Sequence, residues 1–196
     1  MISNVSICNR ALNLIGQKTI TALTEASSQA IKCNLIFEDT RNLILSEAWW
    51  NFATVEEVLS LISDAQTLKY DYVYSYPALC LAIRDIYNEY TILNSKPGVY
   101  EVIDYEGVKA IATNIELAYL KYTKKIVDPS KFSLAFIEAL VYRLASQLAH
   151  QLNGSVELAD NMLQKSLAYV SEAKRLNHQE GLKVPDQQIP YINARG

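Results

Sequence analysis

Histidine and cysteine are the residues of this chain best suited to catalysis or metal binding, and both are scarce. The two histidines, His150 and His178, lie far apart, and His150 falls on the polar side of a helical pattern. A catalytic site would need a base near a nucleophile or a cluster of metal ligands. The sequence contains no HExxH or GxSxG motif, no phosphate-binding glycine loop and no paired carboxylate motif. We therefore expect no enzyme, no cofactor and no metal site.

The three cysteines, Cys8, Cys33 and Cys80, are an odd number at wide spacing and form no CxxC pair. Structural zinc sites favour such pairs, so a metal centre is not indicated. We expect the cysteines to be small buried residues of a protein that lives in a reducing compartment.

The charge balance does not indicate a phosphate-binding surface. Lys and Arg number 18 against 21 for Asp and Glu, which gives a net charge of -3. A domain that binds nucleic acid usually concentrates basic charge on one face. No apolar run reaches the roughly 18 residues of a membrane span, and no secretory signal opens the chain. We expect a soluble protein, made in a cytosol, with no membrane partner.

Four tyrosines alternate along one stretch: Tyr70, Tyr72, Tyr74 and Tyr76. In a strand they would point to one side, and aromatic ladders of this kind can stack bases or sugars. Stacking platforms are usually interleaved with Lys and Arg, whereas here Lys69 is opposed by Asp71. We favour a strand edge or subunit contact, in which the rings are buried and the hydroxyls are hydrogen-bonded.

The two tryptophans, Trp49 and Trp50, stand between a helical pattern and a β-like one. Two large rings followed by Phe52 can fill the wedge between a helical layer and a sheet, provided that each indole N–H finds a partner. We prefer this inter-layer core role for Trp49, Trp50 and Phe52 over a ligand site.

Apolar residues at helical spacing predict four helices. Ser3 or Asn4 can cap the first of them, and Asp128 followed by Pro129 supplies a start for the third. The short connection at 153–155 makes the last two helices antiparallel neighbours. The expected helices cover about 4–15, 28–48, 130–153 and 156–176.

Between the second and third helices, at about 53–125, β-branched and aromatic residues collect in short runs separated by glycine turns. This pattern predicts an antiparallel β-meander. After residue 176 the glycine and prolines disfavour a helix, so 177–196 is predicted to be an extended arm. The expected fold is α+β and mainly α. It has one domain at 1–176, an antiparallel four-helix bundle with an inserted β-meander, followed by the extended C-terminal arm.

Several stretches, taken in order, resemble one family. They are CNRALNLIG, then TITAL, LSEAWWNFA after the second helix, Tyr76-Pro77 before an apolar strand, DPSKF at the third helix, and PYINAR near the end. In residue type and order they resemble the head-to-tail adaptor proteins of tailed bacteriophages, also called tail tubular protein A or head completion proteins. The resemblance spans almost the whole chain.

The resemblance implies a virion structural protein that assembles with copies of itself as a ring, commonly a dodecamer, at the head–tail junction. Such a ring would bind the portal protein on one side and the next tail or nozzle protein on the other. It would continue the DNA channel and let genomic DNA pass without specific binding. The matched end of the chain points to a portal-docking arm: Pro190, Tyr191, Ile192 and Arg195. The four alternating tyrosines would be subunit or tail contacts.

A closed ring of identical subunits requires two different, complementary faces on each subunit. Polar but uncharged side chains on the last two helices could supply them: Gln147, Gln151, Gln164 and Ser166. A twelvefold ring would carry about 12 × 3 = 36 formal negative charges, which disfavours adhesion to DNA, and we expect Glu and Asp to outnumber Lys and Arg on the channel wall. The alternative function is a cytosolic binding domain that uses the tyrosine ladder for nucleic acid or sugar.

Overall fold

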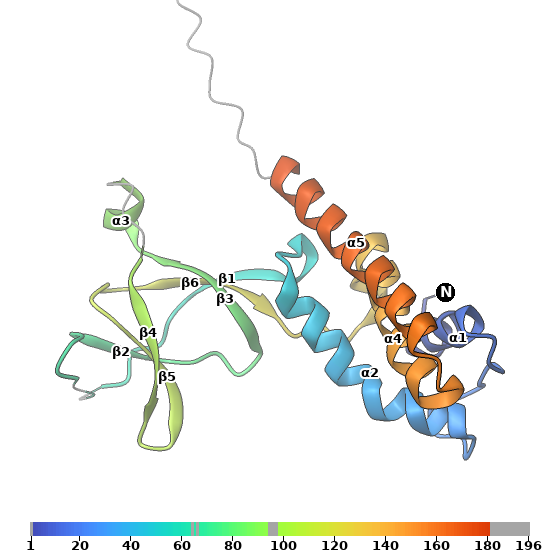
Figure 1. The fold of residues 1–196 in the computed structure, drawn as a ribbon. Helices are drawn as coiled ribbons and strands as arrows, with labels where there is room; N and C mark the ends of the chain where they lie inside the picture. Colours follow the sequence, from blue (N-terminus) through green and yellow to red (C-terminus); the bar gives the residue numbers. More distant parts are fainter. Residues whose placement is uncertain (1, 64, 66, 94–97, 181–196) are drawn as a thin grey trace, which may run out of the picture.

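The structure is a computed structural model that describes residues 2–63, 65, 67–93 and 98–180. Its long helices gather on one side and its strands on the other, and α2 leads directly into the β-rich part (Figure 1). The elements of the helical side are α1 (Asn4–Leu14), α2 (Ser28–Glu47), α4 (Leu134–Leu148) and α5 (Val156–Glu180). A short helix, α3 (Glu89–Leu93), lies on the β side.

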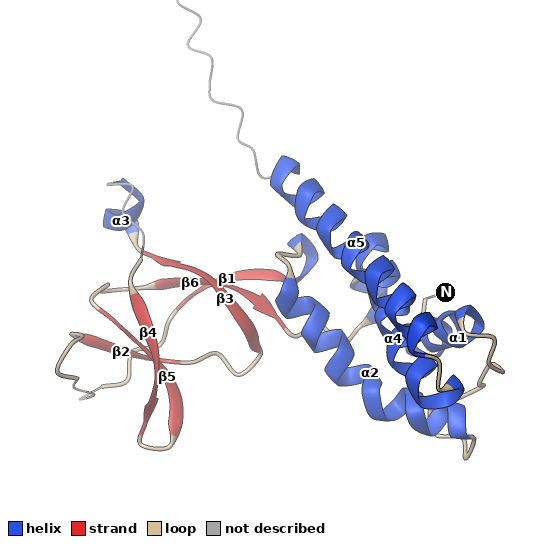
Figure 2. Ribbon diagram, in the orientation of Figure 1, coloured by secondary structure: helices blue, strands red, loops and turns tan. Residues whose placement is uncertain are grey.

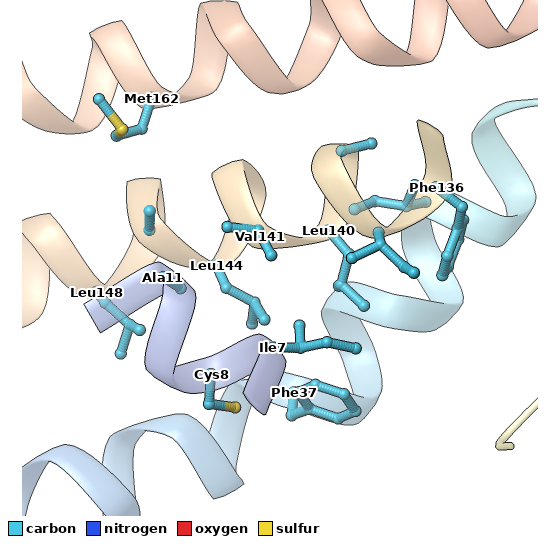
Figure 3. Packing of buried hydrophobic residues seen from close by; sticks show 14 of the residues in the cluster. Ile7, Cys8, Ala11, Phe37, Phe136, Leu140, Val141, Leu144, Leu148 and Met162 are labelled. Atoms are coloured by element: carbon cyan, nitrogen blue, oxygen red, sulfur yellow. The ribbon is translucent and has the colours of Figure 1, made fainter. Parts of the chain in front are cut away.

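The helical core forms around α4, which packs against α1, α2 and α5, while α1 and α2 touch each other much less. Figure 3 shows Ile7 of α1, Phe37 of α2 and Leu140 of α4 converging between the three helices. All three side chains are buried. Because α4 carries apolar residues around most of its circumference, it can serve as the common partner of the other helices.

Serine side chains cap the starts of the four long helices. Ser3 and Ser6 form a reciprocal capping box at α1, in which each hydroxyl accepts the other residue's backbone N–H. Ser27 caps α2, Ser133 caps α4, and Ser155 accepts from the backbone of the first turn of α5. These caps satisfy backbone donors that have no partner within the helix.

The connection from α1 to α2 is organised by the carboxylate of Glu25. It accepts hydrogen bonds from the Ser27 hydroxyl and from both the backbone N–H and the hydroxyl of Thr21. These bonds, that of Ser27 first, lower the pKa of Glu25 to about 2, since they favour the charged carboxylate.

Within the described part of the chain, six strands form two antiparallel sheets of three strands each (Figure 2). The first sheet has the order β1–β6–β3 and the second the order β2–β5–β4. Only β4 and β5 pair as neighbours in sequence, through a tight turn at Glu106 and Gly107, both with positive φ. The strands are β1 (Thr54–Val58), β2 (Tyr72–Ser75), β3 (Cys80–Tyr87), β4 (Tyr100–Tyr105), β5 (Val108–Thr113) and β6 (Tyr119–Lys124).

The expected four-helix bundle with one inserted meander is therefore wrong. The described residues form an α+β fold with five α-helices and two separate sheets. A meander pairs strands in sequence order, whereas β1 pairs with β6, so that Thr54 lies opposite Thr123. The chain changes sheet at every connection between consecutive strands except β4 to β5. Local periodicity identifies strands, but it carries no information about such distant pairing.

Three predicted helix ends also differ from the structure. Asp128 and Pro129 begin a 3-10 turn (Pro129–Lys131), and α4 starts later, after its own cap Ser133. At the other end, α4 passes into a π-helical turn (Ala149–Asn153), and Gly154 ends it with a left-handed conformation, φ 65°. α5 continues to Glu180, so residues 177–180 are helical and not part of an extended arm.

Arg84 of β3 joins the sheet to the end of α2. Its guanidinium donates to the carbonyl oxygens of Ala48 at 2.6 Å, Ser46 at 3.0 Å and Leu45 at 3.4 Å. It also donates to the Thr123 hydroxyl at 2.8 Å. The last carbonyls of a helix have no partner within the helix and carry partial negative charge, so a cation is favoured there. This contact fixes the first sheet against the helical side.

Candidate functional site

The four alternating tyrosines do not form one exposed ladder. Tyr70 and Tyr74 are buried, with 8% and 2% of their surface exposed, and Tyr72 and Tyr76 are half-buried. Tyr70 belongs to a small cluster with Val73, whereas the other three pack on the cluster around Leu120.

Hydroxyl and ring contacts also hold these tyrosines in place. The Tyr74 hydroxyl donates to the carbonyl of Ile115 at 2.9 Å, and its burial raises the pKa of the phenol. The Tyr76 ring lies under the ammonium of Lys109, 3.8 Å from the ring centroid. β2 is an edge strand of its sheet, but the buried rings leave no continuous platform on which bases or sugars could stack.

The two tryptophans have different environments. Trp50 is 1% exposed, its ring meets Phe136 edge-on at 5.0 Å, and its indole N–H donates to the carbonyl of Ile44 at 2.8 Å. Phe52 packs beside it against the same core. Trp49 is 42% exposed and lies below the ammonium of Lys121, so its assignment to the inter-layer core is wrong. Adjacent residues in extended backbone point in opposite directions, which separates the two rings.

Among His150, Cys8, Cys33 and Cys80, the structure brings only Cys8 and Cys33 together. His150 lies exposed on the π-helical turn, and the Cys80 side chain is half-buried in β3. Cys8 and Cys33 are fully buried, and a hydrogen bond with Cys33 together with burial raises the pKa of Cys8 above its ordinary value. Across the residues that the structure describes, no three His, Cys, Asp or Glu side chains are placed to hold a metal ion. None of the described helices could span a membrane.

The predicted portal-docking residues, Pro190, Tyr191, Ile192 and Arg195, lie outside the described residues. Of the polar residues expected on subunit faces, Ser166 is fully buried and donates to the carbonyl of Ala139 at 2.9 Å. Ser166 is therefore not a surface residue. Gln147 is half-buried between α2 and α4, and Gln151 and Gln164 are exposed.

The outer face of α2 is the most unusual surface of the helical side. Ile31, Leu35 and Leu43 are exposed there, Leu35 by 68%, although α2 already buries another apolar face in the core. Their spacing of four and eight residues places them along one side of the helix, over about 18 Å. We call Ile31, Leu35 and Leu43 the α2 ridge. A surface helix normally has one apolar face and one polar face, so the ridge is a candidate contact surface.

An open groove of about 460 Å³ runs beside the α2 ridge, between α2 and α4. Leu35, Leu43 and Ile36 supply apolar walls, and Asp39 and Gln147 supply polar groups. Thr40 in the groove donates to the carbonyl of Ile36 at 2.7 Å and contacts Gln147 at 3.2 Å. Combined apolar walls and fixed polar groups are typical of a specific protein contact.

A second groove, of about 280 Å³, lies between α1 and α4. We call it the α1/α4 groove. Arg10 of α1 and Glu138 of α4 form an ion pair at this position. Its lining residues are Arg10, Asn13, Leu14, Glu138, Val141 and Tyr142. Tyr142 also stacks on Tyr169 of α5, with ring centroids 5.5 Å apart, so the groove has a firm aromatic edge.

On the β side, a further apolar surface lies around α3 and the turn before β6. Ile92, Leu93 and Leu117 are strongly exposed there. Asn88, just before α3, donates to the carbonyl of Glu116 at 2.9 Å and so holds the two segments together. We call Ile92, Leu93 and Leu117 the α3 surface.

No protein-family model matches the chain, and a search of curated proteins finds no match. The resemblance to phage adaptors therefore stays a prediction.

Sequence reasoning missed both the α2 ridge and Arg84. The ridge had a signal, since Ile31, Leu35 and Leu43 fall outside the helical stripe that explains the core. Arg84 had none, because a single arginine in a strand pattern does not reveal which helix end it will meet.

Proposed function

We propose that the chain is a structural subunit of a tailed-bacteriophage virion, which assembles as a ring between portal and tail. The observation that carries this proposal is the α2 ridge, an exposed apolar face on a helix that is already anchored in a core. A ring of identical chains would cover this face in every subunit. The sequence resemblance suggests that this ring would be a head-to-tail adaptor ring.

The separation of the two candidate surfaces supports the same proposal. The α2 ridge lies on the helical side, and the α3 surface lies on the β side (Figure 1). An adaptor needs one surface for its neighbours in the ring and another for the next tail component. In this proposal, the helical side closes the ring and the α3 surface faces the tail protein.

The arm would add the portal contact. Each arm that docks after the first does so at high effective concentration, so a ring of weak arms binds strongly to a partner ring. Because α5 continues to Glu180, the chain should be shortened after residue 180 and not at 177, which leaves the helix intact. We expect this truncation to abolish binding to the portal and to preserve self-association.

The test combines the purified chain with the portal protein encoded by the same genome, followed by electron microscopy and sedimentation. We expect closed rings on the portal. Leu35→Asp should reduce ring formation strongly. Burying a polar group without a hydrogen-bond partner costs about 2–7 kcal/mol, and an unpaired carboxylate in an apolar contact costs at least as much. Leu68→Asp is the matched control, since Leu68 is fully exposed in a loop on the β side. Rings that form equally well with Leu35→Asp would contradict the role of the ridge.

A further inference from the structure

Cys8 and Cys33 are two nucleophilic side chains that meet inside the helical core. Cys8 comes from α1 and Cys33 from α2, and both are fully buried free thiols in the cluster around α4. Figure 3 shows the Cys8 side chain pointing from α1 into the space beside α2. A hydrogen bond joins the Cys8 thiol to the Cys33 sulfur, so the two side chains are in contact.

Small side chains let α1 and α2 approach each other closely at this point. Ala11 follows Cys8 by three residues, Ala30 precedes Cys33 by three, and both alanines are fully buried. Residues three apart lie on the same face of a helix, so each of the two facing surfaces presents an alanine beside its cysteine. A disulfide requires Cα atoms within about 7 Å of each other, a distance that large side chains on these faces would prevent.

We propose that Cys8 and Cys33 are a redox pair, which stays a dithiol under reducing conditions and is converted by hydrogen peroxide into a disulfide that ties α1 to α2. The inference does not depend on the proposed ring, because both residues lie in one chain. Cys80 is not part of the pair, since it belongs to β3 and packs on the cluster around Leu120.

The two thiols have different roles in the oxidation. The hydrogen bond with Cys8 lowers the pKa of Cys33, whereas that bond and burial raise the pKa of Cys8, so Cys33 loses its proton first. The Cys33 thiolate attacks one oxygen of hydrogen peroxide and breaks the O–O bond, which gives a sulfenic acid and a hydroxide that takes up a proton to become water.

The second step closes the disulfide. The sulfur of Cys8 attacks the sulfenic sulfur of Cys33, the S–S bond forms, and the S–O bond breaks. The leaving oxygen departs as water with the proton of Cys8. Two thiols and one hydrogen peroxide therefore give one disulfide and two water molecules, and no further reactant is needed.

The disulfide would strengthen a part of the core that has few direct contacts. α1 and α2 each pack on α4 but touch each other much less. Their connection is held by polar contacts, among them the two hydrogen bonds of 2.8 Å that the Asn9 side chain exchanges with the backbone of Ile20. A covalent link from residue 8 to residue 33 closes this loop also in the unfolded chain, which loses conformational freedom. Unfolding should therefore require more urea.

Thiol labelling and urea unfolding of the full-length chain test the proposal. Cys80→Ala removes the third thiol and serves as the background. The protein is incubated overnight with hydrogen peroxide, unfolded without reductant and treated with N-ethylmaleimide. We expect both remaining cysteines to be labelled in the reduced chain and neither in the oxidised chain. Mass spectrometry of proteolytic fragments should show the peptides of Cys8 and Cys33 joined.

The oxidised background should unfold at a urea midpoint about 1–2 M above that of the reduced protein, and dithiothreitol should reverse the shift. Cys8→Ala and Cys33→Ala, each made in the same background, are the matched controls. Neither can form the disulfide, so their midpoints should not rise with peroxide. Any effect of peroxide on Met162 or on other side chains is shared by these controls. Two controls are used so that one suffices if the other does not fold.

The outcomes bear on the redox pair alone. Full labelling of both cysteines after oxidation would overturn it, and so would blocked thiols whose peptides are not joined. A disulfide that leaves the urea midpoint unchanged or lowers it would overturn the tie between α1 and α2. The proposed ring is measured separately, with portal protein, so it can fail while the redox pair stands, and the reverse also holds.

Discussion

Replacing Arg84 by Met tests whether one side chain fixes the sheet to the helical side. Methionine keeps much of the aliphatic volume and removes the guanidinium. The change takes away the donors to Ala48, Ser46 and Thr123, at 2.6, 3.0 and 2.8 Å. The carbonyls at the end of α2 would then depend on water, and α2 would lose a cation at its negative end.

The magnitude follows from these contacts. A hydrogen bond with a charged partner contributes about 1.5–3 kcal/mol, and such bonds are not additive when they share one group. Arg84 is half-buried, so water can replace part of what is lost. We expect the free energy of unfolding to fall by about 2–4 kcal/mol, which at a slope of about 2–3 kcal/mol/M lowers the urea midpoint by roughly 0.7–2 M.

Urea unfolding followed by tryptophan fluorescence measures the effect, because Trp50 lies at the same junction. Arg175→Met is the matched control: Arg175 pairs with Glu172 on the exposed side of α5, and its loss should change little. If Arg84→Met unfolds at the same urea concentration as the unaltered chain, Arg84 does not hold the two parts together.

Two further predictions concern the tryptophans and the loop carboxylate. Trp50→Phe should lower the free energy of unfolding by about 2–4 kcal/mol, since it leaves a buried carbonyl without its donor and removes core volume, whereas Trp49→Phe should cost less than about 0.5 kcal/mol. Circular dichroism during urea unfolding compares them, and equal effects would contradict the assignment of one core ring and one surface ring. The pKa of Glu25, lowered from 4.5 to about 2, means that its contribution to stability is present above pH 4.5 and is lost as the pH falls toward 2. Glu25→Gln should therefore be less stable than the unaltered chain at neutral pH and equal to it near pH 2, and an NMR titration that gives Glu25 an ordinary pKa would refute this.

The helices could be predicted because their signals are local. Apolar spacing located them, and Ser3 marked the start of α1 through a hydroxyl that satisfies backbone donors three residues away. The start of α4 was misplaced because two caps compete within a few residues: Asp128 starts only a 3-10 turn, and Ser133 starts the helix. Both residues are good helix caps, and the sequence alone does not show which of them starts the helix.

The sheets could not be predicted in the same way, because their pairing is not local. β1 and β6 are neighbours although more than 60 residues separate Thr54 from Thr123. The alternation of the tyrosines does place Tyr72 and Tyr74 on one side of β2, where their rings stack with centroids 6.3 Å apart. Whether that strand face is buried, however, depends on which other element covers it. The same limit applies to the candidate site, where the exposure of Leu35 follows from which side of α2 meets α4.

α2 lies between the proposed ring contact and the proposed tail-facing surface. A neighbour bound at the ring contact would therefore also determine where the tail-facing surface lies. One side of α2 lies in the helical core, the other forms the ridge, and its end is held by Arg84 of the first sheet. A neighbour that docks on the ridge therefore fixes α2, and α2 fixes the sheet that leads to the α3 surface. Because β3 and α3 are consecutive in the chain, the tail-facing surface would be positioned by the ring contact without touching it. Weakening the contact of Arg84 with the end of α2 should then reduce binding of the tail protein while the ring still closes. Loss of the ridge cannot produce this pattern, because it prevents the ring from closing.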